Sequence, residues 1–167
     1  MNIVVIANLV SMVGCVLMVA VGLLQKRRQI LLVQCVQFAI LGAANLMLGA
    51  MTGFVSGIVS IVRNLVYLRR EDVGRLKFGF IAVQLVVSLS VGIEGLIDWF
   101  PIVSTVLFTW FLETKSEVRL KLVIIAAQSL WLIYDFVYLN YVTMAFDALT
   151  ILSNAMGILV LLRKTKE

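Results

Sequence analysis

The chain has 167 residues, of which 62% are hydrophobic and 14% are charged, and its mean hydropathy is +1.09. Soluble domains average about 45–50% apolar and about 25% charged residues, so this composition excludes a soluble domain and predicts an integral membrane protein. The formal net charge is +5, but the basic residues stand in short clusters between apolar runs and leave no basic face for nucleic acid.

Seven apolar stretches are candidates to cross a membrane, because about 20 helical residues span roughly 30 Å of hydrocarbon. The fifth stretch is the shortest and has Pro101 near its start, where a helix tolerates proline. In chain order the stretches are 3–24, 30–50, 53–68, 78–93, 97–112, 122–142 and 144–162. The sequence therefore predicts an all-α integral membrane protein.

Lysine and arginine occur in every second loop, as expected because loops that stay in the cytoplasm retain them. The turns between these loops contain no basic residue. This pattern predicts seven spans, with the N-terminus outside and the C-terminus inside. Only Arg63 falls inside a span; the other basic residues are Lys26, Arg27, Arg28, Arg69, Arg70, Arg75, Lys77, Lys115, Arg119, Lys121, Arg163, Lys164 and Lys166.

The two halves of the chain are similar at an offset of 94 residues. Gln34 aligns with Gln128, and YLRR at 67–70 aligns with LLRK at 161–164. Four crossings separate the copies, so they share one orientation. We therefore predict two parallel three-helix bundles, residues 1–70 and 97–167, joined by a linker helix in 71–96, the 3+1+3 arrangement seen in SWEET sugar facilitators.

Four predicted helices carry polar residues at intervals of three or four, which places them on one helical face. Amides and carboxylates that faced lipid would have no partner, so these faces predict a shared polar interior. The residues are Gln34, Gln37 and Asn45 on the second helix, Gly53, Ser56, Ser60 and Arg63 on the third, Gln128, Trp131, Asp135 and Tyr138 on the sixth, and Asp147, Thr150 and Asn154 on the seventh.

Two charged residues decide how this interior is interpreted. Arg63 lies six residues before Arg69, about 9 Å along a helix, so its long side chain can either reach lipid phosphate or line a wet cavity. Asp135 lies in the middle of its span, where a short carboxylate must pair, take up a proton or meet water. We predict that Asp135 lines the cavity and is a candidate proton carrier, whereas Asp147 is expected near the outer surface.

Aromatic and small residues have two interpretations. Trp131 and Tyr134 are too deep for an interfacial aromatic belt, and rings beside a carboxylate suit a planar or sugar-like solute that stacks on them. Glycines and serines at helical spacing, such as Gly49, Gly53 and Gly57, also serve close helix packing and then need no ligand.

Four stretches resemble the YgjV family of small bacterial inner-membrane proteins. The resemblance implies a multi-pass protein of the bacterial inner membrane with a seven-helix 3+1+3 fold related to the SWEET proteins and the PnuC vitamin-precursor transporters. The chain lacks a proline-glutamine pair and has no proline in a span apart from Pro101, so no gating hinge is visible. The stretches are GFVSGIVSIVRNLVYLRR, FPIVSTVLFTW, VRLKLVIIAAQSLWLIYDFVYLNYV and ALTILSNAMGILVLLRK.

Two hypotheses of function remain open. The first is a transporter or facilitator of a small polar or aromatic solute, with its pathway between the bundles. The second is a non-transporting interaction or structural protein, in which contacts such as Arg63 to Asp135 or Asn154 to Asn64 fasten the helices. The predicted pathway residues are Asn45, Ser60, Arg63, Asn64, Gln128, Trp131, Tyr134, Asp135 and Asn154.

An enzyme is not expected, because no nucleophile-base pair is legible. The chain contains no histidine, and its Cys, Asp and Glu residues lack metal-ligand spacing, so neither a metal site nor a cofactor is predicted. The lipid bilayer is the expected partner, and association with further copies of the chain stays open.

Overall fold

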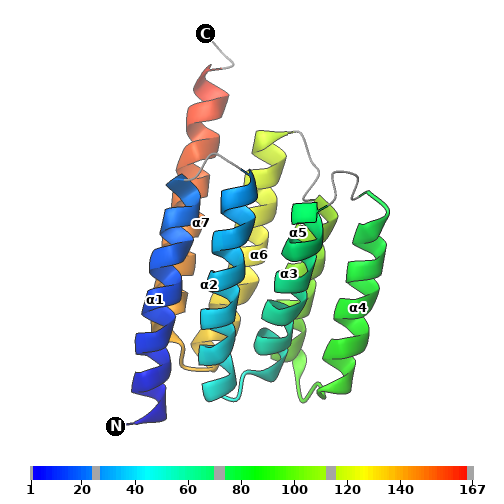
Figure 1. The fold of residues 1–167 in the computed structure, drawn as a ribbon. Coiled ribbons are helices and arrows are strands. Elements are labelled where there is room, and N and C mark those ends of the chain that lie inside the picture. Colours follow the sequence, from blue (N-terminus) through cyan, green and yellow to red (C-terminus); the bar gives the residue numbers. More distant parts are fainter. Residues whose placement is uncertain (1, 24–26, 70–73, 112–115, 165–167) are drawn as a thin grey trace.

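The computed structural model describes residues 2–23, 27–69, 74–111 and 116–164, and Figure 1 shows that this part of the chain is all-helical. The prediction of an all-α protein is thereby confirmed. The helices are α1 (Ile3–Leu23), α2 (Arg27–Met47), α3 (Met51–Arg69), α4 (Leu76–Ser90), the short 3₁₀ helix η1 (Leu96–Asp98), α5 (Trp99–Phe111), α6 (Glu117–Val137) and α7 (Tyr141–Lys164).

Three helices in the described residues are long and apolar enough to cross a membrane. They are Met51–Arg69, Val118–Val137 and Tyr141–Arg163. The other four helices contain shorter apolar segments of 10–17 residues, which are Ile3–Val19, Leu31–Met47, Leu76–Ser90 and Leu96–Phe111.

Two predicted spans extend past the real helix ends. Residues 30–50 and 122–142 were expected to be helical, but α2 ends at Met47 and α6 ends at Val137. Each helix is followed by a tight turn with a residue of positive φ, Gly49 at 75° and Leu139 at 60°. These turns carry no charge, and hydropathy stays high on both sides of them, so the sequence does not show the reversal of the chain.

The structure also corrects the offset of the internal similarity from 94 to 90 residues. α2 and α6 each have 21 residues and begin 90 residues apart, as do α3 and α7. The turns match as well, since the Ala50 N–H donates to the Asn45 carbonyl and the Asn140 N–H to the Asp135 carbonyl, both at 2.8 Å. An error of four residues is about one helical turn, which leaves the polar face unchanged and so escapes detection in sequence.

The matched turns predict a stabilising substitution. Leu139 adopts a left-handed conformation, which costs a residue with a Cβ about 1–2 kcal/mol and glycine far less. Leu139→Gly is expected to raise the melting temperature in detergent by a few degrees. The reciprocal Gly49→Leu is expected to lower it, although a Cβ at Gly49 would meet nothing within 4 Å. If both substitutions shifted the melting temperature in the same direction, the left-handed backbone conformation would not determine the stability of these turns.

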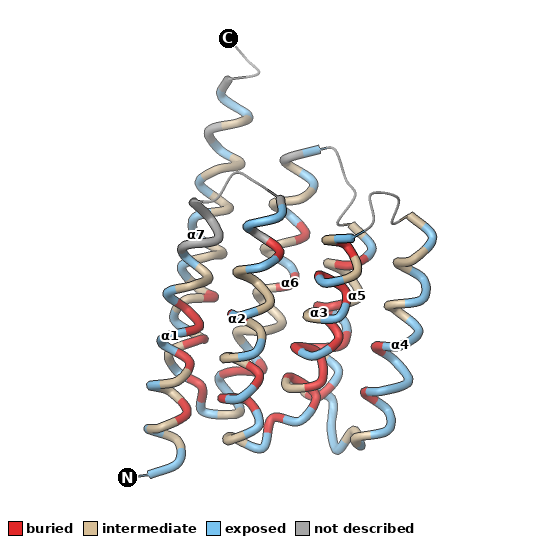
Figure 2. Tube along the Cα trace, viewed as in Figure 1, coloured by how far each residue is buried: buried red, intermediate tan, exposed pale blue. Residues whose placement is uncertain are grey.

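Six helices pack as a closed ring, with one further helix outside it. α2 contacts α1 and α3, α6 contacts α5 and α7, and the two sets meet where α1 contacts α7 and where α3 contacts α5. α4 contacts only α3 and α5 among the strongly packed pairs. Figure 2 shows that the buried residues of the ring helices face one another, while α4 is mostly exposed.

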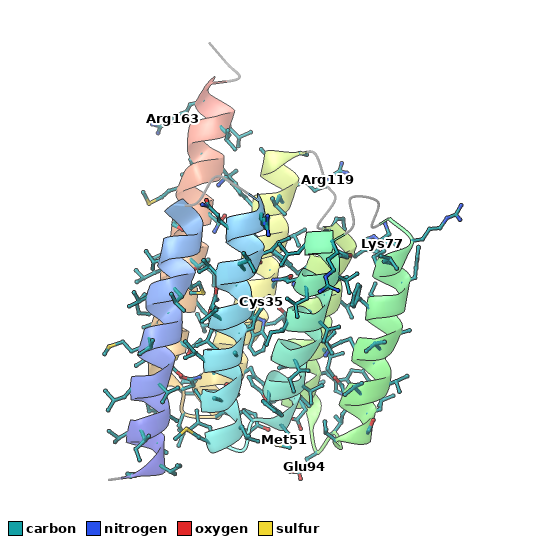
Figure 3. The ribbon with its side chains drawn as sticks, in the orientation of Figure 1. Cys35, Met51, Lys77, Glu94, Arg119 and Arg163 are labelled. Carbon is teal, nitrogen blue, oxygen red and sulfur yellow. The ribbon has the colours of Figure 1, made fainter. Side chains whose placement is uncertain are left out.

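Charge is distributed unequally between the two ends of the molecule. In Figure 3 the labelled Lys77, Arg119 and Arg163 lie toward one end, whereas Met51 and Glu94 lie at the other. The N-terminal end of α1 is at the Glu94 end, and the C-terminal end of α7 is at the basic end (Figure 1). This is the separation that the alternating basic loops of the sequence predict.

Candidate functional site

The ring encloses a cavity of about 390 Å³, a volume typical of small-molecule sites. Helices α1, α2, α3, α5, α6 and α7 all contribute lining residues, and α4 contributes none. Two of the nine predicted residues, Asn64 and Tyr134, do not line the cavity. The seven that do are Asn45, Ser60, Arg63, Gln128, Trp131, Asp135 and Asn154.

Asp135 presents its carboxyl group to this cavity from the last turn of α6, which ends at Val137, and not from the middle of a span as predicted. Its side chain is 1% exposed, and within the described residues neither carboxyl oxygen has a hydrogen-bond partner. Asn140 and Asp147 lie beside it and influence it through their side chains. A buried carboxyl group without a donor of its own costs stability, so Asp135 does not act as a simple fastening between helices.

Asp147 belongs to the same site, although it was not among the predicted pathway residues. It is 2% exposed, lines the cavity, and has one buried oxygen, Oδ2, without a partner in the described residues. The span was predicted to begin at residue 144, whereas α7 begins at Tyr141. The earlier start places Asp147 nearly two turns inside the helix, on the face that Thr150 and Asn154 share.

Arg63 points into the protein and not toward lipid. It is 2% exposed, and its Nη1 donates a hydrogen bond to Thr109 Oγ1 at 2.9 Å. Its Nε and Nη2 donate longer bonds to Asn64 Oδ1, at 3.4 and 3.3 Å, and the guanidinium carbon lies 5.6 Å from the centre of the Phe108 ring. The alternative that Arg63 reaches lipid phosphate is therefore wrong.

Asn64 does not line the cavity, but it holds Arg63, which does. Its Nδ2 donates to Gln34 Oε1 at 3.1 Å while its Oδ1 accepts from Arg63. Asn154 donates to the Thr150 carbonyl of its own helix. The contacts expected from a purely structural role, Arg63 to Asp135 and Asn154 to Asn64, do not form in the described part of the chain.

Tyr134 fastens two helices together, so the expectation that it stacks on a solute is not met. It is fully buried, and its hydroxyl accepts a hydrogen bond from the Gly53 N–H at 2.9 Å and lies 3.0 Å from Thr52 Oγ1. Its ring meets Trp131 edge-on at 5.6 Å. Trp131 alone of this pair presents its ring to the cavity.

A polar seam joins the two halves at the end of the molecule that carries Glu94. Asn8 on α1 accepts from the Val142 N–H at 3.0 Å and donates to the Leu139 carbonyl at 2.9 Å. Asn140 Nδ2 donates to Asn45 Oδ1 at 3.4 Å. Together with the bonds of Tyr134 to α3, these contacts close the ring at this end. We define the seam as Asn8, Asn45, Thr52, Gly53, Tyr134 and Asn140.

Asp98 connects the seam to the start of α5 by further hydrogen bonds. Its Oδ1 accepts from the Tyr138 hydroxyl at 2.7 Å and from Thr52 Oγ1 at 3.5 Å. Its Oδ2 accepts from the backbone N–H groups of Glu94 and Gly95 at 3.0 and 3.2 Å. Asp98 is thus a fully bonded buried carboxylate, in contrast to Asp135.

The cavity therefore carries two opposite charges that do not neutralise each other. Arg63 has no carboxylate partner within the described residues, and Asp135 has no basic one. Gln128 and Ser60 add further polar groups to the wall. Such a wall can bind a small polar solute by hydrogen bonds and charge.

Comparison with known proteins gives one match. A family described as "Bacterial inner membrane protein", Imp-YgjV, matches residues 5–165. No curated protein and no solved structure matches the chain. The relation to SWEET and PnuC proteins implied by the sequence resemblance therefore has no support from these comparisons.

Proposed function

Because the chain belongs to the Imp-YgjV family of bacterial inner membrane proteins, we propose that it carries a small solute across that membrane. In this proposal all seven α-helices cross the bilayer in a 3+1+3 arrangement, with α4 as the linker helix. The N-terminus is outside and the C-terminus is inside. The basic end that includes Arg119 and Arg163 (Figure 3) supports this orientation, since cytoplasmic loops retain basic residues.

The observation that carries the proposal is the buried, unpaired Asp135 on the wall of a cavity between the two halves. A charged or polar group inside a membrane protein is costly, and groups that lack a protein partner commonly mark a solute pathway. The seam supports a closed periplasmic end in this conformation. In the proposal, the two halves move apart at the seam to admit solute from that side.

The alternative is a structural or interaction protein without transport. It is favoured by the bonds that do fasten helices, such as Asn64 to Gln34 and Gln84 Nε2 to Ser56 Oγ at 2.8 Å. Arg63 also fits this alternative through its bond to Thr109, but Asp135 does not, because neither of its carboxyl oxygens has a hydrogen-bond partner among the described residues. We therefore place the transport hypothesis first.

The proposal is tested by solute flux in proteoliposomes. The panel consists of labelled amino acids, short peptides, monosaccharides and nucleosides, and Asp135→Asn is compared with the parent chain. We expect uptake of at least one class by the parent and a loss of about tenfold or more in Asp135→Asn. Glu94→Gln, which changes an exposed acid outside the cavity, is the matched control and should transport normally. Parent flux equal to that of empty liposomes would exclude the proposal.

A further inference from the structure

The acidic and basic side chains of the cavity, which form no ion pair with each other in the described residues, define the class of solute that it accepts. This inference rests on the proposed function, because it assigns the solute of the same site. Asp135 and Asp147 lie at one level of the ring and Arg63 lies at another. All three line the cavity, and all are at least nine-tenths buried.

The carboxyl end of the cavity lacks hydrogen-bond donors. Three buried oxygens, both of Asp135 and Oδ2 of Asp147, have no donor within the described residues. A protonated amine has three N–H donors on one compact group and a positive charge. It therefore supplies both the donors and the charge that this end lacks. Trp131, which also lines the cavity, offers a ring face for such a cation.

The arginine end lacks an anion. A guanidinium has five N–H donors, and Thr109 and Asn64 take up three of them. Two N–H groups, one on each terminal nitrogen, are left for a ligand. A carboxylate or phosphate accepts such a pair in a two-bond arrangement, which neither Thr109 nor Asn64 provides.

The repeat gives the distance between the two ends. At the offset of 90 residues, Asp147 on α7 corresponds to Gly57 on α3. Parallel equivalent helices place these two residues at the same height. Arg63 lies six residues beyond Gly57, which is about 9 Å along the helix axis. Along the helix axis, the two ends of the cavity are thus about this far apart.

We propose that the cavity binds an amphoteric solute, with its amine at Asp135 and Asp147 and its carboxylate or phosphate at Arg63. An extended tripeptide spans roughly 10 Å between its termini and has this charge pattern. A single amino acid is too short to reach both ends. The structure thus assigns zwitterionic solutes of about tripeptide length to this site.

Calorimetric binding of triglycine to the detergent-solubilised parent chain tests the proposal. The matched probes are N-acetyltriglycine, which lacks the amine, triglycine amide, which lacks the carboxylate, and glycine, which is too short. We expect triglycine to bind about tenfold or more tightly than each of the three. Equal affinity for triglycine and both blocked forms, or no binding of triglycine, would overturn the inference.

Two variants test which charged end of the solute each side chain binds. Asp135→Asn is expected to abolish the preference for triglycine over N-acetyltriglycine, and Arg63→Gln the preference over triglycine amide. Glu94→Gln should keep both preferences. If Arg63→Gln does not fold, Arg63→Lys keeps the charge and should retain part of the preference. Loss of both preferences in each variant would mean a general loss of the cavity and would overturn the assignment.

The results separate this inference from the proposed function. If the parent chain transported monosaccharides but did not bind triglycine, the inference about the solute would be wrong and the proposed transport would be supported. If the parent chain bound triglycine selectively but transported no solute, the proposed transport would be wrong and the binding site would be supported.

Discussion

Asp135→Leu is expected to make the protein more stable and to abolish transport. Both carboxyl oxygens of Asp135 are buried without a hydrogen-bond partner in the described part of the chain, and an unsatisfied buried polar group costs about 1–3 kcal/mol. Leucine removes this cost, and the adjoining cavity gives room for its larger side chain. We expect the melting temperature in detergent to rise by a few degrees, while flux in proteoliposomes falls to background.

Asp98→Leu is the matched control for this prediction. Asp98 is also buried, but its two oxygens accept four hydrogen bonds, including one from Tyr138 at 2.7 Å. Its removal leaves buried donors unpaired and should cost about 3 kcal/mol or more. The two acidic residues are therefore expected to shift the melting temperature in opposite directions. A loss of stability in Asp135→Leu as large as that in Asp98→Leu would identify Asp135 as a structural residue.

Gly53→Ala is expected to produce a large loss of stability for the addition of a single methyl group. A Cβ on Gly53 would lie 2.8 Å from Asn45 Nδ2, 2.8 Å from Tyr134 Cε1 and 3.0 Å from the Tyr134 hydroxyl. Tyr134 is fully buried and bonded to the Gly53 N–H itself, so it cannot move aside without breaking the seam. We expect a cost of about 3 kcal/mol, measured as a drop in melting temperature on the order of 10 °C.

Gly79→Ala on α4 separates this clash from a general effect of glycine replacement. A Cβ at Gly79 meets nothing within 4 Å, and alanine is favoured over glycine inside a helix by about 0.5–1 kcal/mol. Gly79→Ala should therefore be neutral or slightly stabilising. Similar melting temperatures for the two variants would mean that the seam does not depend on close approach at Gly53.

Gly53 also shows which contacts can be predicted from the sequence and which cannot. Gly53 was assigned to a polar face and to a small-residue packing series, both from spacing alone. Its partner Tyr134 is 81 residues away, and no local pattern joins them. Tyr134 was therefore assigned to the solute, because the predicted span placed it too deep and its hydrogen bonds to α3 were not visible in sequence.

Within the site, the prediction was most accurate for charged residues, because a charge inside a membrane protein needs water or a partner whatever its neighbours in sequence are. Arg63 and Asp135 were singled out because charged groups inside a membrane protein need water or a partner, and both line the cavity. Asn140 was missed because the predicted sixth span continued to residue 142 and so placed it inside a helix. The same error of five residues placed Asp135 in the middle of a span, whereas it lies in the last turn of α6.

Composition and periodicity by themselves determined that the chain is helical, that it belongs in a membrane, and that four helices have polar faces. These properties depend on local hydrophobicity and on the 3.6-residue repeat, which every segment carries within itself. Only the tertiary structure decided which polar groups meet. Whether Arg63 finds Thr109 or Asp135, and whether Tyr134 meets a solute or Gly53, depends on how helices far apart in sequence are rotated against each other, and that rotation is fixed by packing across the whole ring.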